Sequence, residues 1–116
     1  MLIGRKHEDT VGEDSVQLNC TDDISTCDVL DLRSFSNALI KQSSGTAGSH
    51  AVYHCESRNG NFTPVFANNS GVYSAVTIDF TSLSGGWTNL EPKVFAGRFF
   101  KFLASGSTQL LACRKS

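Results

Sequence analysis

Two histidines are the first side chains in this sequence that could do chemistry. His50 and His54 lie in a segment, 50–56, whose alternating apolar and polar residues predict a β-strand with both imidazoles on one face. Hydrolysis would need a nucleophile or a metal beside them, and the spacing of the other residues provides neither. We therefore interpret the two histidines as the polar side of a half-exposed strand.

Adjacent acidic residues are the next candidates for acid–base chemistry. They occur as Glu8-Asp9, Glu13-Asp14 and Asp22-Asp23, all in segments that we expect to be an arm or a turn. A general acid needs a carboxyl group whose pKa is raised by an apolar site, which exposed neighbouring acids lack. The spacing of a calcium-binding loop is also missing. We predict no catalytic residue and no enzyme.

The four cysteines do not have the spacing of a metal site. Zinc sites use close pairs such as C-x2-C, whereas the closest pair here, Cys20 and Cys27, is separated by six residues. We predict no metal and no cofactor. Disulfides are not favoured in a reducing cytoplasm, so Cys20, Cys27, Cys55 and Cys113 are expected to be buried or half-buried free thiols.

Length and charge exclude several classes of protein. The chain has 116 residues, enough for one domain, and a net charge of −1, which argues against a nucleic-acid-binding protein. No apolar run approaches the roughly 20 residues of a membrane span. The first residues lack the apolar core of a signal peptide, so we expect a protein that is made and kept in a cytoplasm or released by lysis.

The charge is divided unevenly along the chain. Residues 1–31 carry eight acids and two bases, whereas residues 32–116 carry three acids and eight bases. We expect residues 1–14 to be an extended arm and residues 15–116 to be a single domain. The arm is either solvated or docked on a basic surface of a neighbouring copy or partner. The candidate partner-binding residues are Leu2, Ile3, Arg5, Lys6, Glu8, Asp9, Glu13 and Asp14.

Alternation and turn residues predict many short strands. Strands are expected at 15–20, 28–33, 50–56, 62–66, 72–80, 98–104 and 108–114, with 37–42 as a strand or a helical turn and 43–49 as a flexible loop. Asn59-Gly60 is the strongest hairpin signal because both residues accept positive φ. Pro64 restricts its strand to a sheet edge.

The last two strands are expected to form the central hairpin. The segments 98–104 and 108–114 flank a three-residue turn that contains glycine, and the first places Phe100, Phe102 and Ala104 on one face. Seven or eight short strands at intervals of about ten residues are typical of an antiparallel β-sandwich or jelly roll. We predict this all-β fold.

Three aromatic residues raise an alternative function. Trp87 beside Gly85-Gly86 could be an exposed platform for a sugar, with Tyr73 and Tyr53 as further aromatic residues among Asn-rich turns. The other interpretation of Trp87 is a loop residue that folds back over one end of the sandwich. A carbohydrate-binding module, such as a head-fibre or receptor-binding domain, is therefore the second hypothesis.

The order of weak motifs resembles the small β-sandwich virion proteins of tailed bacteriophages. The motifs are DVLDLRS, YHCESRNGNFTPV, AVTIDF, KVFAGRFFKF and the final RKS, at 28–34, 53–65, 75–80, 93–102 and 114–116. The resemblance implies a capsid decoration, or cement, protein: a homotrimer on the capsid surface that bridges copies of the major capsid protein after assembly in the host cytoplasm. Similar motifs occur in discoidin-like and other carbohydrate-binding sandwiches, so the alternative stays open.

Overall fold

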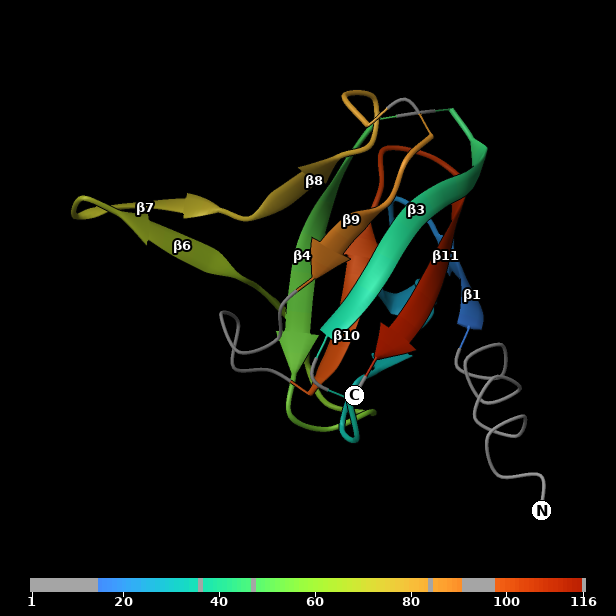
Figure 1. Cartoon of the computed structure of the whole chain (residues 1–116). Helices are drawn as coiled ribbons and strands as arrows, with labels where there is room; N and C mark the ends of the chain where they lie inside the picture. The colour runs from blue at the N-terminus through green and yellow to red at the C-terminus, as the bar shows by residue number, and fades with distance from the viewer. Residues whose placement is uncertain (1–14, 36, 47, 84, 91–97, 116) are drawn as a thin grey trace, which may run out of the picture.

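The fold is a sandwich of two antiparallel sheets from which one hairpin projects (Figure 1). The computed structural model describes residues 15–35, 37–46, 48–83, 85–90 and 98–115. In these residues, strands are joined by loops and by a single 3-10 turn, η1 (Ile24–Thr26). The prediction of an all-β antiparallel sandwich is confirmed.

The first sheet has four strands in the order β1-β11-β3-β9, and every neighbouring pair is antiparallel. Its strands are β1 (Ser15–Cys20), β11 (Thr108–Lys115), β3 (Asn37–Gly45) and β9 (Thr88–Leu90).

The second sheet has the order β2-β10-β4, and both β5 and β8 lie along the free side of β4. Its strands are β2 (Leu30–Asp31), β10 (Phe99–Leu103), β4 (Ser49–Cys55), β5 (Thr63–Pro64) and β8 (Thr77–Asp79). Pro64 therefore lies at the edge of the sheet, as its missing N–H donor predicts.

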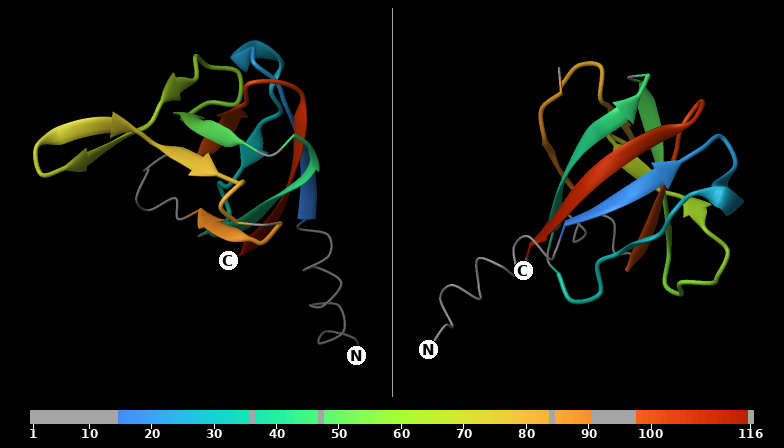
Figure 2. Two further views of the ribbon diagram at one scale, coloured as in Figure 1. Left: turned by 90° about the horizontal axis from the view of Figure 1, so that it is seen from above. Right: turned by 90° about the vertical axis from the view of Figure 1, so that its right-hand side faces the viewer.

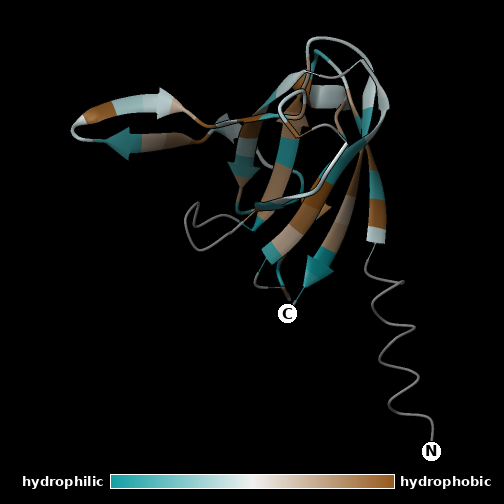
Figure 3. Ribbon diagram, turned by 45° about the horizontal axis from the view of Figure 1, so that its top comes forward, coloured by the Kyte–Doolittle hydropathy of each residue, from teal (hydrophilic) through white to brown (hydrophobic). Residues whose placement is uncertain are grey.

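The core lies between the two sheets and consists of alternate residues of facing strands. The first sheet contributes Leu18, Ile40, Leu110 and Ala112, and the second contributes Leu30, Val52, Phe100 and Phe102. Phe100 and Phe102 are fully buried, and each contributes about 1.5–3 kcal/mol by leaving water. Figure 3 shows the matching alternation of hydrophilic and hydrophobic bands along the strands.

The predicted hairpin of the last two strands is wrong. β10 pairs with β2 and β4, whereas β11 belongs to the other sheet and pairs with β1 and β3. The connection between them crosses from one layer to the other (Figure 2). Because Phe102 and Leu110 are both inward-facing, the two strands face each other across the core instead of lying side by side.

The hairpin predicted at Asn59-Gly60 is confirmed, since β4 and β5 pair antiparallel on either side of the loop 56–62, in which the backbone N–H of Gly60 donates to the carbonyl oxygen of Ser57 at 3.2 Å. The positive φ expected of the two residues is wrong, because neither is among the described residues with positive φ. Gly60 is required there for another reason, since a Cβ at this position would lie 2.5 Å from Sγ of Cys55. The glycine thus permits a close approach of the loop to β4.

Four other predictions need new boundaries. The predicted strand 62–66 forms only the short β5, and a separate strand, β6 (Phe66–Asn69), begins after Val65. The segment 28–33 forms only the short β2, and the predicted loop 43–49 is mostly strand, because β3 continues to Gly45 and β4 begins at Ser49. The predicted long strand 72–80 is divided into β7 (Val72–Ala75) and β8. Val72, at the start of this segment, is 64% exposed.

Candidate functional site

The most prominent surface feature is a two-stranded hairpin that leaves the sandwich. It consists of β6 (Phe66–Asn69) and β7, paired in register from Phe66 with Ala75 to Asn69 with Val72. Every residue from 66 to 75 is exposed. Figures 1 and 2 show the hairpin extending away from both sheets, so it forms a separate arm of the molecule.

The tip of the hairpin is a two-residue turn formed by Ser70 and Gly71. Both residues have positive φ, 55° and 87°, which is the geometry of the turn type that matches the twist of paired strands. The Oδ1 atom of Asn68 accepts a hydrogen bond from the backbone N–H of Gly71 at 2.9 Å. These local features explain why the segment 68–71 reverses the chain sharply.

A junction of three valines anchors the hairpin to the sandwich. Val52 of β4 donates its N–H to the carbonyl oxygen of Val76 at 3.0 Å, and it accepts a bond from Val65 at 2.9 Å. Val76 donates to the carbonyl oxygen of Val65 at 2.8 Å, which closes the ring of three bonds. Val52 and Val65 are buried, and Val76 packs against the core, so the base of the hairpin is held firmly.

The hairpin is uncharged and carries exposed apolar side chains. No charged residue or histidine occurs between Arg58 and Asp79. Three large side chains of the arm are open to solvent: Phe66 is 57% exposed, Val72 64% and Tyr73 68%. The register places Phe66 and Tyr73 on one face of the ribbon and Val72 on the other. Both faces can therefore contact a partner.

The two candidate sugar-stacking residues stand apart. Tyr73 lies on the projecting hairpin, whereas Trp87 immediately precedes β9 on the body of the sandwich (Figure 1). Trp87 is 43% exposed, so it does not fold back completely over the sandwich. The Nζ atom of Lys41 lies 5.1 Å from the centre of its ring. Tyr53, the third aromatic candidate, is half-buried on β4.

The other candidate partner-binding residues all fall in 1–14. They therefore lie outside the described residues. This applies to Leu2, Ile3, Arg5, Lys6, Glu8, Asp9, Glu13 and Asp14.

The interpretation of His50 as part of an exposed polar face is wrong. His50 is 1% exposed and shares the inward face of β4 with Val52. Its Nε2 atom lies 2.8 Å from Oγ1 of Thr108 on the opposite sheet, and its ring meets Phe80 edge-on at 5.0 Å. Burial lowers the pKa of His50, against a smaller opposing effect of the Gly48 backbone. The imidazole is a neutral packing group.

The four cysteines are free thiols that are buried or half-buried in the sandwich. Cys20 and Cys27 are buried, and Cys55 and Cys113 are half-buried. Burial is the largest cause that raises the pKa of Cys20 to about 12, with nearby Cys27 adding to it. A thiol with this pKa is protonated at neutral pH and is a poor nucleophile.

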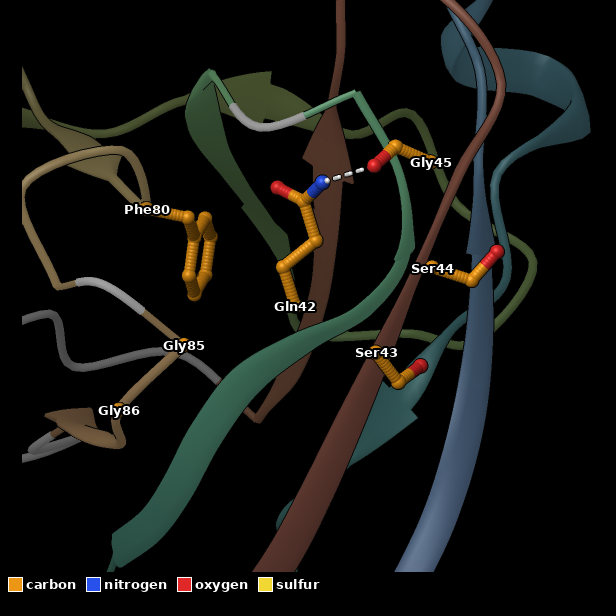
Figure 4. Close-up of a pocket in the computed structure, with 7 residues that line it drawn as sticks. All are labelled: Gln42, Ser43, Ser44, Gly45, Phe80, Gly85 and Gly86. Carbon is orange, nitrogen blue, oxygen red and sulfur yellow. Dashed lines mark hydrogen bonds between the residues drawn. The ribbon is translucent and has the colours of Figure 1, made fainter.

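The surface of the described part of the chain has several small hollows. The hollow in Figure 4 has a volume of about 190 Å³, and the side chain of Gln42 points into it opposite Phe80. This volume is smaller than the roughly 300–1,000 Å³ typical of small-molecule sites. Two larger hollows, of about 350 Å³ beside Thr108 and about 360 Å³ beside Lys101, reach only the lower part of that range. Within the described residues, no three His, Cys, Asp or Glu side chains are grouped to hold a metal ion. No described helix is long and apolar enough to cross a membrane.

The pattern of the sequence does not predict the projecting arm. The alternation of 72–80 continues unbroken through Val76. Nothing in this period therefore marks the boundary between β7, in the projecting hairpin, and β8, which pairs with β4. One signal was available, namely the run of twenty residues without charge between Arg58 and Asp79. Exposed strands of monomeric proteins usually carry charges that discourage pairing.

The sequence has no significant match to a protein-family model or to a curated protein. Among solved structures, the crystal structure of the SPBc2 prophage-derived protein YomS is similar, with a TM-score of 0.49 and 13% sequence identity. The alignment covers 88% of this chain and 95% of that chain. The identity is too low to equate any residue of YomS with a residue of this chain.

Proposed function

We propose that this chain is a structural assembly protein that attaches to a neighbouring protein subunit through the β6–β7 hairpin. The observation that carries the proposal is an uncharged arm, exposed along residues 66–75, on a firmly held base. A ribbon of two strands is marginally stable by itself, and both of its edges can pair with another chain. A partner would cover the arm and stabilise it.

The binding free energy of one such contact is modest, so stable attachment would need several copies of the contact. Burying Phe66, Val72 and Tyr73 contributes about 1.5–3 kcal/mol for each side chain, before the cost of association is subtracted. One hairpin therefore gives weak binding. Many copies on a symmetric surface, or several hairpins in one oligomer, give tight binding through multivalency.

The specific context that we propose is the capsid surface of a tailed bacteriophage. The sequence resemblance over residues 28–116 supports a decoration protein, with the major capsid protein as partner and a homotrimer as the active oligomer. The hairpin would then span the boundary between neighbouring capsid subunits. Assembly would take place in the host cytoplasm.

The role that we propose is not catalytic. His50 and Cys20, whose side chains could in principle act in catalysis, are used for packing. His50 joins the two sheets through Thr108, and burial raises the pKa of the Cys20 thiol to about 12. Both arrangements favour stability over reactivity.

Co-sedimentation tests the proposal. The probe is undecorated shells assembled from the major capsid protein of the same phage genome. The wild-type chain should sediment with them, and the triple variant Phe66→Ser, Val72→Ser, Tyr73→Ser should lose at least tenfold in affinity. Trp87→Ser is the matched control, since it removes an exposed aromatic residue from the body of the sandwich and should bind normally. Equal binding of the triple variant, or no binding by the wild type, would overturn the proposal.

Carbohydrate binding is the second candidate, and one feature of the hairpin favours it. Tyr73 lies directly opposite Asn68, so an aromatic ring and an amide occupy the same face of the ribbon. Rings stack on sugars while amides bind their hydroxyl groups. A glycan array separates the candidates: binding that is lost in Tyr73→Ala supports a carbohydrate site, and absence of any bound glycan removes it.

A further inference from the structure

A cluster of arginines surrounds Asp31 at one end of the sandwich. The carboxylate of Asp31 accepts hydrogen bonds from Nε and Nη2 of Arg33, at 2.8–3.3 Å, and from Nη2 of Arg58 at 3.3 Å. Arg114 of the other sheet donates through Nη1 to the backbone oxygen of Asp31 at 3.3 Å. Three guanidinium groups thus converge on one acidic residue.

The ring of Phe99 holds two of these guanidinium groups in place. Arg33 and Arg58 lie over it, with Cζ atoms 5.1 and 5.5 Å from the ring centre, and Phe99 is only 3% exposed. The side chains of Arg33 and Arg58 are 54% and 52% exposed. Each guanidinium has five N–H donors, so both arginines can also bind a carboxylate from outside.

Two further cations lie at the same end. Arg98 directly precedes β10, and its carbonyl oxygen accepts a bond from Leu32, the residue after β2, at 2.9 Å. Lys115 follows Arg114 at the end of β11. We call Arg33, Arg58, Arg98, Arg114 and Lys115 the basic end. In the segments that carry these cations, 30–33, 56–58, 98–99 and 113–115, the acidic residues are Asp31 and Glu56. Five positive charges therefore face two negative charges.

The acidic N-terminal segment is attached beside the basic end. Residues 1–14 carry Glu8, Asp9, Glu13 and Asp14 against two basic residues. They join β1 at Ser15, which pairs with Cys113, the residue before Arg114. The segment is long enough to span roughly 45 Å when extended, more than is needed to reach an adjoining molecule.

We propose that the basic end binds the acidic segment of residues 8–14 from a second copy of this chain, so that copies associate by exchanging their N-terminal segments. The charges of the two surfaces are complementary. Because the segment joins the described chain at Ser15, beside the strand end that carries Arg114, two copies that meet at their basic ends bring each attachment point close to the other's arginines. Each copy gives one segment and receives one.

This contact can be reciprocal in a dimer or can follow a closed ring, because it joins two different surfaces. It does not depend on the proposed role of the hairpin, since it involves different residues and needs no shell. Its test uses the full chain alone, so failure of one proposal leaves the other intact.

The test is a mixing experiment read out by light scattering and sedimentation equilibrium. One variant reverses the basic end (Arg33→Glu, Arg58→Glu), and the other reverses the segment (Glu8→Lys, Asp9→Lys, Glu13→Lys, Asp14→Lys). Each alone should be a monomer at about 50 mM salt, at concentrations where the wild type is an oligomer. An equimolar mixture should associate again, because both contacts between the variants are complementary. A contact within one copy cannot be restored by mixing.

Single reversals provide the matched control. Asp14→Lys should weaken self-association several-fold, whereas Asp22→Lys, at an exposed position outside the segment, should leave it unchanged. If the basic-end variant does not fold, judged by its circular dichroism, Arg98→Glu with Lys115→Glu takes its place. A wild type that stays a monomer at low salt, or an oligomer whose mass is the same in the segment variant, would overturn the proposal. Recovery of no oligomer on mixing would do so too.

Discussion

The backbone N–H of Val76 donates to the carbonyl oxygen of Val65 at 2.8 Å, at the point where the β6–β7 hairpin leaves the sandwich. Both valines also bond to Val52 of β4. The bond separates two environments: Val65 is 7% exposed, whereas Phe66, the next residue, is 57% exposed. Residues on the two sides of this boundary should therefore respond differently to mutation.

The base of the hairpin should matter for stability and its arm should not. Val65→Ala removes buried methyl groups and should lower the free energy of unfolding by about 1–2 kcal/mol. Val72→Ala makes the same change on the exposed arm and should alter it by less than about 0.5 kcal/mol. Urea unfolding followed by circular dichroism gives both values. Equal losses would mean that the arm is packed against the sandwich.

The close approach of Gly60 to Cys55 predicts that substitutions at these two positions have coupled effects on stability. Gly60→Ala places a Cβ 2.5 Å from Sγ of Cys55, so it should destabilise the protein by about 1–3 kcal/mol. In the Cys55→Ala background the obstacle is gone, and the same substitution should cost much less. Gly106→Ala is the control, because a Cβ there meets nothing within 4 Å. A loss that is the same in both backgrounds would contradict this geometry.

Acid should weaken the fold through His50. Burial lowers its pKa in the folded state, so the unfolded chain takes up a proton first as the pH falls below the ordinary histidine value. The stability is therefore complete above that value and decreases below it. The melting temperature should fall as the pH drops from about 6.5 to about 5.5, and the fall should be smaller in His50→Gln. An unchanged pH profile in that variant would contradict the assignment.

The cysteines should differ in reactivity. Cys20 is 1% exposed and its pKa is raised to about 12, so iodoacetamide should leave it unlabelled in the native protein near pH 8. The half-buried Cys55 and Cys113 should react first. Mass spectrometry of the labelled peptides identifies the sites. Early labelling of Cys20 would show that β1 opens readily at its end.

Local alternation was sufficient to predict much of the sandwich and insufficient for its connections. The inward faces of β1 and β10 follow the period of two, and Leu18 and Phe102 lie in the core as expected. The same period cannot distinguish strands that pair side by side from strands that face each other, which is why β10 and β11 were joined wrongly. Only the packing of Phe102 and Leu110 between layers settles that choice.

The candidate site was harder to predict because its only sequence signal is the lack of charged residues between Arg58 and Asp79. An exposed hairpin without charges looks, residue by residue, like an ordinary half-buried strand, which is why the sequence predicts one continuous strand over 72–80. His50 shows the reverse error, since a polar side chain on the face of Val52 is buried once Thr108 supplies a hydrogen-bond partner from the other sheet. Both outcomes depend on tertiary contacts that sequence period does not encode.

Photocrosslinking from the hairpin tests most directly whether the arm is the docking element. A photoreactive phenylalanine analogue replaces Tyr73 in one sample and Trp87 in another, and each is irradiated with undecorated shells of the phage. The account predicts a crosslink to the capsid subunit from position 73 and little or none from position 87. Crosslinking from position 87 alone, or from neither position while the protein still binds the shell, would contradict it.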